Sequence, residues 1–517
     1  MNAAATALDP STPILVGCGD VTDLTTPAAA GRSPYDLIAE AARQALADTG
    51  AAPALGAAID TVAMLRSFAD TSYRFASGIG TSSNPPNSVA RRLGLRASRH
   101  LYTWNGGNMP QWLVNLFGEQ IARGEMRAAL ICGGEALRTQ HGIQRDGLPV
   151  SWAEDPGGTP ELIGDSRRAW SDHEERHGLH AAIAFYPLFE NGIRGARGAA
   201  LEPHLRSMGA LLAHFAAVAA ANPRAARREG MSAERLATID ADNRWIGFPY
   251  PRFMNAHAFI DQAAALVMTS VGLAQQLGIA RDKWVFLHGC ADGNDHWFVS
   301  DRVDFHSSPA IRAVARQALA MADRSLDDIA LFDLYSCFAS AIEIACAEIG
   351  LAEHDARGLT VTGGLPFFGG PGNNYVTHAI AEMMRRLRAA PDRFGLVSAN
   401  GNYLTKHSWG VYSTTPTAGP WQREDPSRLQ NELDRRPKAP FTAKPAGRAT
   451  IETYTVMHDR DGPSFAVLFG RLAATGERFV ANTPGDAATL HDLQQREGLG
   501  RSGTVSHHDG RNTFVPD

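Results

Sequence analysis

Short apolar runs alternate with amphipathic stretches twice along this chain, once before and once after a long segment of different character. In the first third, apolar runs of strand length lie at residues 13–17, 59–65 and 128–132. Residues 34–49 and 108–123 carry apolar side chains at helical spacing. Strands that alternate with helices typically form a largely parallel sheet covered by helices. We therefore predict an α/β fold with such a sheet.

The same alternation returns after residue 250. Residues 261–277 are rich in alanine and predict a helix or a strand followed by a helix. Further helices are predicted at residues 308–322 and 338–349, and further strands at residues 329–334 and 395–398. The two halves share this plan without readable sequence identity. We therefore expect a core of two similar halves.

The remaining segments differ in composition. Residues 138–247 are rich in Arg, His and Ala and predict an inserted helical domain or a long functional excursion. Residues 419–440 are polar and contain proline, which is typical of a linker. From residue 449 onward, short alternating runs predict a small β-barrel or sandwich. The expected segments are 1–137 (first half), 138–247 (insertion), 248–290 (rest of the first half), 291–418 (second half), 419–440 (linker) and 441–517 (C-terminal domain).

Composition narrows the classes of function. The chain has 517 residues, with 49 Lys and Arg against 54 Asp and Glu. A charge so close to balance argues against a nucleic-acid or membrane-surface partner. The five cysteines include no Cys-x-x-Cys pair, so neither a disulfide framework nor a cysteine-rich zinc site is expected. No Lys or Arg precedes Arg32, and no apolar run reaches the length of a membrane span, so a soluble cytoplasmic protein is expected.

Two local patterns are too weak to assign a function. His173 to His177 match the H-E-x-x-H pattern of zinc proteases, but the neighbouring residues are charged, which favours a solvated helix face. The glycine-rich run at residues 363–374 matches neither a P-loop nor a dinucleotide-binding fingerprint. No metal is therefore expected.

Three stretches taken together resemble the thiolase superfamily, closest to the sterol-carrier-protein-type thiolases and their thiolase-like relatives of type 1. They are Asn255–Ser270 (NAHAFIDQAAALVMTS), Leu331–Phe338 (LFDLYSCF) and Gly363–Pro371 (GGLPFFGGP). The resemblance implies a layered αβαβα core of two similar halves and a helical loop domain. It also implies coenzyme A, bound as a thioester substrate.

The resemblance also shows which catalytic groups are missing. Counting back from Gly124, Gly107 falls at the place of the family's nucleophilic cysteine. Gly370 falls at the place of its histidine, and Ala399 at the place of its second cysteine. Glycine has no side chain that can form a thioester or move a proton. Two-step thiolysis by that machinery is therefore excluded on this alignment, and Cys337 does not replace the nucleophile.

What remains is a set of backbone donors and new polar side chains. The N–H groups of Gly107 and Gly401 can still hold a thioester or enolate oxygen, helped by the dipole of the helix that follows. Tyr335 replaces the first residue of the family's Asn-Glu-Ala-Phe or His-Asp-Cys-Phe motif. These new groups form either an acid/base set or filler for the vacated space. The further candidates are Tyr403, Lys406, His407, Asn374 and His378.

Arginines of the insertion are candidates for the phosphates of coenzyme A. The alternative for each of them is a solvated basic face. His257 stands where the family has a serine on the pantetheine side, which predicts altered or weak CoA binding. The candidate arginines are Arg224, Arg227, Arg228 and Arg235.

A second resemblance concerns the C-terminal domain and the reaction. Steroid side-chain retro-aldolases are thiolase-like, lack the nucleophilic cysteine, and work with an OB-fold partner subunit. Residues 447–514 resemble such an OB-like barrel and the extra C-terminal domain of mycobacterial-type thiolase-like proteins. The resemblance implies an acyl-CoA-binding protein of the acetyl-CoA acetyltransferase family that acts on a C–C bond beside a thioester, as a monomer or homodimer. A pathway enzyme is a possible partner of the barrel, and a non-catalytic CoA-thioester binder or scaffold is the alternative.

Overall fold

The core of the fold is one ten-stranded sheet in a computed structural model that describes residues 8–71 and 75–517. The elements of the first half are β1 (Pro13–Thr22), α1 (Pro34–Asp48), α2 (Ala52–Ala58), β2 (Thr61–Met64), α3 (Pro85–Leu93), β3 (Arg99–Thr103), α4 (Met109–Ala122), β4 (Ala128–Ala136), β8 (Asp261–Ser270) and α10 (Val271–Gln276). The elements of the second half are β9 (Val285–Asn294), α11 (Pro309–Met321), β10 (Ile329–Asp333), α12 (Ala339–Ile349), α13 (Tyr375–Ala389), β11 (Phe394–Gly401) and β12 (Lys406–Ser413).

The order of the strands shows that the two halves mirror each other. It runs β10-β11-β12-β9-β1-β8-β4-β2-β3-β5, with β5 (Glu161–Ile163) at one edge. The halves meet where β1 pairs with β9, with Ile14 opposite Phe286. The sheet is mixed rather than largely parallel, because β8 pairs antiparallel with β1 and β4, and β12 with β9 and β11. Apolar periodicity predicts a buried strand but not its direction.

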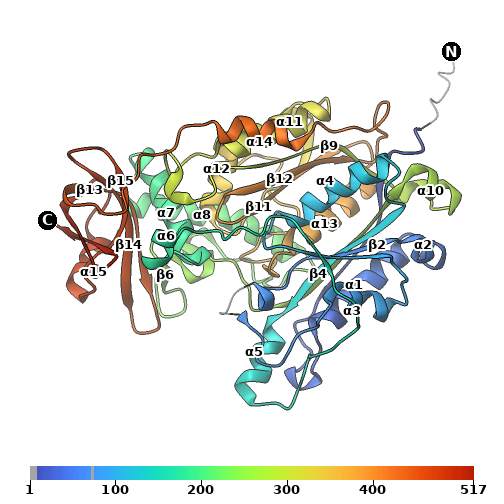
Figure 1. Ribbon diagram of the computed structural model, residues 1–517, viewed down its shortest axis with the longest axis horizontal. Helices are drawn as coiled ribbons and strands as arrows, with labels where there is room; N and C mark the ends of the chain where they lie inside the picture. Colours follow the sequence, from blue (N-terminus) through green and yellow to red (C-terminus); the bar gives the residue numbers. More distant parts are fainter. Residues whose placement is uncertain (1–7, 72–74) are drawn as a thin grey trace.

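Helices cover the outer faces of the two halves of the sheet and also lie between the halves (Figure 1). Helix α1 packs on β1, β4 and β8, and α11 packs on β9 and β12. Helices α4 and α13 lie between the two halves and contact strands of both. The layered α/β core of two similar halves is therefore confirmed. As a result, α4 and the turn before it lie between the two halves of the core.

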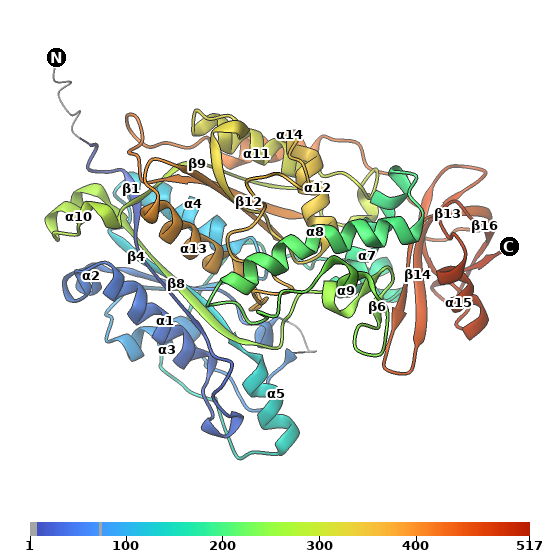
Figure 2. The same cartoon turned by 180° about the vertical axis from the view of Figure 1, so that it is seen from behind.

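Residues 138–247 connect the core to the C-terminal domain. About half of these residues lie in helices, and Figure 2 shows α7 and α8 running from the core toward the C-terminal strands. Gly247 at the end of this region pairs with Met457, so the region adds two short strands to the C-terminal sheet. The elements are α5 (Leu137–Asp146), α6 (Asp172–Arg176), α7 (Ala182–Ala196), α8 (Leu201–Ala221), α9 (Ala233–Ala237), β6 (Trp245–Gly247) and β7 (Tyr250–Pro251).

The C-terminal domain is a small closed barrel. Its elements are β13 (Gly447–His458), β14 (Pro463–Leu472), β15 (Arg478–Asn482), α15 (Ala487–Gln495), β16 (Ser502–His508) and β17 (Arg511–Pro516). The order β14-β15-β17-β16-β13 closes because β13 also pairs with β14. The expected barrel is therefore confirmed over a sandwich. Within residues 8–71 and 75–517, no helix has the length and apolarity needed to cross a membrane.

The segment expected to be a linker contains a helix, α14 (Pro426–Asp434). Asp425 caps it by accepting a hydrogen bond from the N–H of Ser427, and Pro426 occupies its first turn. Leu429 and Leu433 are buried where α14 packs against β9 and α11. These residues therefore form part of the folded core rather than a free connection.

A buried arginine of the barrel, Arg478, forms hydrogen bonds with the core. Arg478 on β15 has no exposed surface and pairs with Glu452, with Nε–Oε2 and Nη2–Oε1 distances of 2.8 and 2.6 Å. Its guanidinium also donates to the carbonyl oxygens of Ser300, Arg302 and Val303 in the core. The barrel and the core are thus joined by desolvated charge-assisted hydrogen bonds, which are stronger than neutral ones.

Candidate functional site

The turn before α4 carries the first candidate residue, Gly107. The N–H of Gly106 donates to Oδ1 of Asn373 at 3.0 Å, which fixes the turn. The N–H of Gly107 has no acceptor among the described residues, and Asn108 follows as the N-cap of α4. A free N–H at the start of a fourteen-residue helix is a donor for an anionic oxygen.

Tyr335 occupies the space that a side chain at position 107 would need. A Cβ atom added to Gly107 would lie 2.3 Å from the Tyr335 hydroxyl oxygen and 2.6 Å from the carbonyl oxygen of Asn400. Real Cβ atoms do not approach other atoms so closely. The absence of a side chain at position 107 therefore makes room for the phenol of Tyr335.

The end of β11 brings Gly401 to the same place. A Cβ atom added to Gly401 would lie 3.2 Å from the backbone nitrogen of Gly107 and 2.6 Å from Oδ1 of Asn108. The next three residues, Asn402, Tyr403 and Leu404, all have positive φ angles of 49°, 57° and 61°. Non-glycine residues rarely adopt this conformation, and runs of it mark functional or tightly constrained loops. Gly107, Tyr335 and Gly401 thus come together as the sequence suggested.

Two residues that the sequence reasoning missed complete the surroundings. Nδ2 of Asn400 donates to the hydroxyl of Tyr186 at 3.0 Å, while Oδ1 of Asn400 is buried without a partner among the described residues. The ring of Tyr186 stacks on Phe338 with centroids 4.4 Å apart. Asn400 lies between the aligned Ala399 and Gly401 and was accessible to the sequence argument. Tyr186 carries no motif and comes from α7, so nothing in the sequence pointed to it.

The electrostatics of the site favour a neutral phenol over a thiolate. Burial raises the pKa of Tyr335 well above its usual value, so the hydroxyl stays protonated near neutral pH. Its hydroxyl makes no hydrogen bond to the described residues, and the side chain is 8% exposed. Burial also raises the pKa of the neighbouring Cys337 thiol to about 12, which removes its nucleophilic form. The hydroxyl of Tyr335 can therefore donate a proton, but the thiol of Cys337 is not activated as a nucleophile.

Gly370, which aligns with the family's histidine, has space for a side chain. A Cβ atom added to Gly370 would make ordinary contacts, 3.4 Å from Leu365 and 3.7 Å from Ala256. Position 107 is filled by Tyr335, whereas position 370 is open. A side chain is therefore excluded sterically at position 107 but not at position 370.

His407 and Tyr403 lie near this loop but contact other groups. Nε2 of His407 is 2.9 Å from the carbonyl oxygen of Leu404 and 3.6 Å from Asp295, on a side of β12 that faces α11. Tyr403 stacks on Phe185 at 4.3 Å. Neither makes a contact with Tyr335 among those of the described residues, so their catalytic roles remain predictions without geometric support.

Asn374 and His378 also point away from the site. Nδ2 of Asn374 donates to the carbonyl oxygen of Gly133 at 2.7 Å, which ties α13 to β4. His378 is fully buried, with Nδ1 3.6 Å from a carboxylate oxygen of Asp20. The residue of this loop that reaches the Gly107 turn is Asn373, one position earlier. The sequence located the loop, but only the fold determines which asparagine faces the turn.

The candidate arginines of the insertion divide into two groups. Arg227 and Arg235 gather around the ring of Phe253, with guanidinium carbons 5.8 and 4.8 Å from its centroid, and Arg252 joins them at 5.8 Å. Burial and the charges of Arg227 and Arg252 lower the pKa of His257 to about 3, so His257 is neutral. Arg235 is also paired with Asp240 at 2.9 Å, so Arg227 and Arg252 are the cations of this patch that have no carboxylate partner among the described residues.

Arg224 and Arg228 lie outside this patch. Nε of Arg224 is 3.0 Å from Oδ1 of Asp20, an acidic residue that also binds Arg385 at 2.6 Å. Arg228 is exposed. The charge of Arg224 is therefore already paired within the protein.

The zinc-protease-like pattern makes structural contacts. Nδ1 of His177 is 2.7 Å from the carbonyl oxygen of His173, and its Nε2 accepts from the N–H of Asn512 at 3.0 Å. Glu174 is buried and receives the N–H groups of Ser171 and Ser300. The pattern thus joins α6 to the barrel.

A separate buried cluster ties α7, α8 and α12 together. Glu190 is 2.6 Å from Nε2 of His204 and accepts a hydrogen bond from Tyr250, and Glu343 pairs with Arg197. Ligand-type atoms of Glu190, His204 and Glu343 lie within 4.8 Å of one another. Burial and the neighbouring carboxylate raise the pKa of Glu343 well above its usual value. A protonated Glu343 explains how two carboxyl groups share this dry site, and the expectation of no metal remains a prediction.

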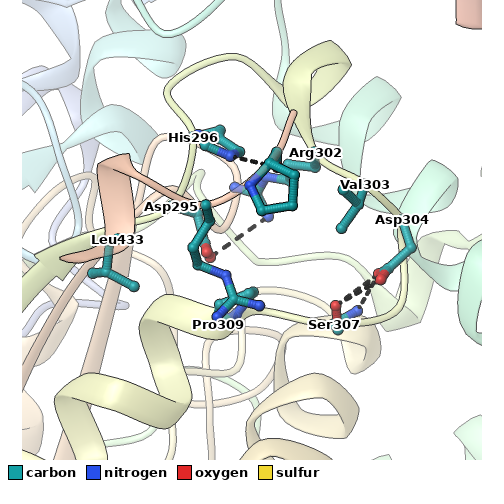
Figure 3. Close-up of a pocket in the computed structure, with 10 residues that line it drawn as sticks. Asp295, His296, Arg302, Val303, Asp304, Ser307, Pro309 and Leu433 are labelled. Carbon is teal, nitrogen blue, oxygen red and sulfur yellow. Dashed lines mark hydrogen bonds and ion pairs between the residues drawn. The ribbon is translucent and has the colours of Figure 1, made fainter. Parts of the chain in front are cut away.

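A small pocket beside His407 is part of the packing (Figure 3). Asp295 lines it and is held by the hydroxyl of Ser308 at 2.5 Å, by the N–H of Ala310 at 3.1 Å, and by the charge of Arg302 at 4.0 Å. Its volume of about 30 Å³ is comparable to one water molecule. The pocket therefore has no room for an organic substrate.

Comparisons with known proteins agree with this architecture. Residues 428–511 match the model of the additional C-terminal domain of thiolase-like protein type 1. The crystal structure of a monomeric SCP2-thiolase-like protein type 1 from Mycobacterium smegmatis is 37% identical, covers 98% of this chain and 100% of that one, and has a TM-score of 0.84. No curated protein matches.

More distant structures share the fold of the core alone. The Ltp2-ChsH2(DUF35) aldolase is 18% identical, with 78% of this chain and 98% of that chain covered and a TM-score of 0.56. An acetyl-CoA acetyltransferase from Syntrophomonas wolfei is 15% identical, with 78% and 99% covered and a TM-score of 0.56. With a thiolase-type core, a closed C-terminal barrel and the near-complete match to the mycobacterial structure, this chain belongs to the SCP2-thiolase-like proteins of type 1.

Proposed function

We propose that this protein binds acyl-CoA thioesters and acts on the C–C bond beside the thioester without a cysteine nucleophile. The observation that carries the proposal is the contact of Tyr335 with Gly107, in the turn before α4. There the hydroxyl of Tyr335 fills the space of a side chain at Gly107, and a free backbone N–H remains next to it. A proton donor and an oxyanion donor are thus adjacent.

These two groups match the needs of retro-aldol cleavage. In this step the β-hydroxyl group of the substrate gives its proton to water and becomes the carbonyl group of the released product, while the electron pair of the breaking C–C bond forms the enolate of the thioester. The N–H of Gly107 and the α4 dipole would stabilise the enolate oxygen. Tyr335, held protonated by burial, would then give its proton to the carbon.

The patch of Arg227, Arg235 and Arg252 supports the binding part of the proposal. Its three cations surround one phenyl ring and approach the glycine-rich loop, because Nη1 of Arg227 donates to the carbonyl oxygen of Pro366 at 3.4 Å. Guanidinium groups bind phosphate oxygens through two parallel hydrogen bonds. The phosphates of coenzyme A would bind at this patch.

The second candidate function is a non-catalytic CoA-thioester binder or scaffold. One observation favours it, namely that Tyr335 is buried and nothing nearby lowers its pKa. The barrel supports either function, because it is fastened to the core and offers its outer surface to a partner enzyme. We place this protein in the cytoplasm, as a monomer or homodimer.

Exchange of the α-protons of acetyl-CoA in D₂O tests the proposal without knowledge of the true substrate. An enzyme that stabilises the enolate exchanges these protons, and Tyr335→Phe should slow the exchange by about 100-fold or more. Tyr412→Phe is the matched control, because Tyr412 is a buried tyrosine that binds Gln111 at 2.7 Å. Absence of exchange in the wild-type protein, together with retained binding of acetyl-CoA, would favour the scaffold.

A further inference from the structure

A cleft lies on the other side of the α4 turn from Tyr335. Its volume is about 540 Å³, within the range of small-molecule sites. Asn108, Met109 and Trp112 of α4 form one wall, and Pro426, Ser427 and Gln430 of α14 form another. The helix in the expected linker thus builds a wall of this cleft.

Lys406, at the start of β12, lines this cleft with its side chain only 3% exposed. Its ammonium nitrogen donates to the carbonyl oxygen of Asn105 and lies 5.9 Å from the centre of the Trp297 ring. Asp165, across the cleft, pairs with Arg167 rather than with Lys406. The amine is therefore buried without a carboxylate partner within residues 8–71 and 75–517.

Lys406 is unusual because the chain contains very few lysines. The chain contains 49 lysines and arginines, of which only four are lysines: Lys283, Lys406, Lys438 and Lys444. Lys283 and Lys438 form ion pairs with Asp48 and Asp301, and Lys444 is exposed. Lys406 alone among the four is buried. Arginine supplies charge almost everywhere else, but it cannot act as a nucleophile, because it does not deprotonate in proteins.

Burial also makes the amine more reactive, because it lowers the pKa of Lys406 from 10.5 to about 8. The charge of Asp165 opposes this shift, and the charge of Arg167 contributes to it. A useful fraction of the neutral amine therefore exists near neutral pH, which is the condition that reactive lysines meet in other enzymes.

We propose that Lys406 captures an aldehyde or ketone in this cleft as a Schiff base. The amine nitrogen bonds to the carbonyl carbon, and the carbonyl oxygen leaves as water with both amine hydrogens, which gives a neutral imine. One further proton from solvent converts the imine to an iminium, whose N–H can donate to the carbonyl oxygen of Asn105. The apolar side chains of Met109 and Trp112 would contact the carbon skeleton. The proposal does not depend on the proposed function, because neither coenzyme A nor Tyr335 takes part.

Trapping with sodium cyanoborohydride tests this inference. The full chain is incubated with propanal or 2-butanone and the reductant, and the adducts are located by peptide mass spectrometry. We expect Lys406 to carry about tenfold or more adduct than the exposed Lys438 and Lys444 near pH 7.5, since burial lowers the pKa of the Lys406 amine. The rate at Lys406 should rise with pH and level off above about pH 8.

Two controls make the result decisive. Lys406→Met should lose the selective adduct, whereas Lys283→Met, which removes another partly buried lysine, should keep it. The comparison between lysines within the wild-type protein needs no variant, so a folding defect in Lys406→Met leaves the test intact. Equal or weaker labelling of Lys406 relative to Lys438 and Lys444 would overturn the proposal.

Discussion

Gly107→Cys is expected to destabilise the protein by about 3 kcal/mol rather than restore a nucleophile. The added Cβ would lie 2.3 Å from the hydroxyl oxygen of Tyr335 and 2.6 Å from the backbone of Asn400, so the surrounding structure must move. Chemical denaturation of the variant and of the wild-type protein measures the loss. Gly485→Cys is the matched control, because a Cβ there has no neighbour within 4 Å and should leave the stability unchanged.

A double-mutant cycle shows whether the two positions are coupled. Tyr335→Asn alone leaves a cavity and should also destabilise the protein. The double variant, Gly107→Cys with Tyr335→Asn, should be more stable than the sum of the two losses predicts, by about 1–3 kcal/mol. Strict additivity would mean that the side chain of Tyr335 does not fill the space at position 107.

Arg478→Met is expected to cost about 3 kcal/mol, because the buried carbonyl oxygens of Ser300 and Arg302 lose their donor, whereas Glu452 and Val303 keep a hydrogen bond from Arg471. The loss should appear as a barrel that unfolds at a lower temperature than the core. Circular dichroism together with limited proteolysis of residues 441–517 separates the two transitions. Arg448→Met, which removes an exposed pair with Asp517, should produce no measurable change. A single unshifted transition in Arg478→Met would show that the barrel is held by other contacts.

Much of the fold follows from patterns that the sequence displays directly. Helical spacing located α1, α4 and α11, because their apolar faces pack on a sheet. Residues 261–277 stayed ambiguous, because β8 is buried on both faces and shows no alternation. The linker expectation failed at α14, although Asp425, Pro426 and the spacing of Leu429 and Leu433 were signals of a helix.

The candidate site was predicted in part. Alignment of motifs located the missing nucleophile at Gly107 and the new tyrosine at position 335. That the two share one space follows from tertiary contact, which no local pattern encodes. The same limit explains His407, because the sequence does not say which side chains of a strand reach Tyr335. His407 and Lys406 both line the cleft on the other side of the α4 turn.

Binding of acyl-CoA is the central requirement of the proposed function, and calorimetry of CoA, acetyl-CoA and a long or steroid-like acyl-CoA tests it most directly. We expect a dissociation constant in the tens of micromolar or tighter for at least one thioester, about −6 kcal/mol. Replacing Arg227 and Arg235 together by alanine should weaken binding about tenfold, since two charge-assisted contacts are lost. Arg206→Ala on the exposed face of α8 should bind as the wild-type protein does. No binding of any of the three compounds by the wild-type protein would contradict the account.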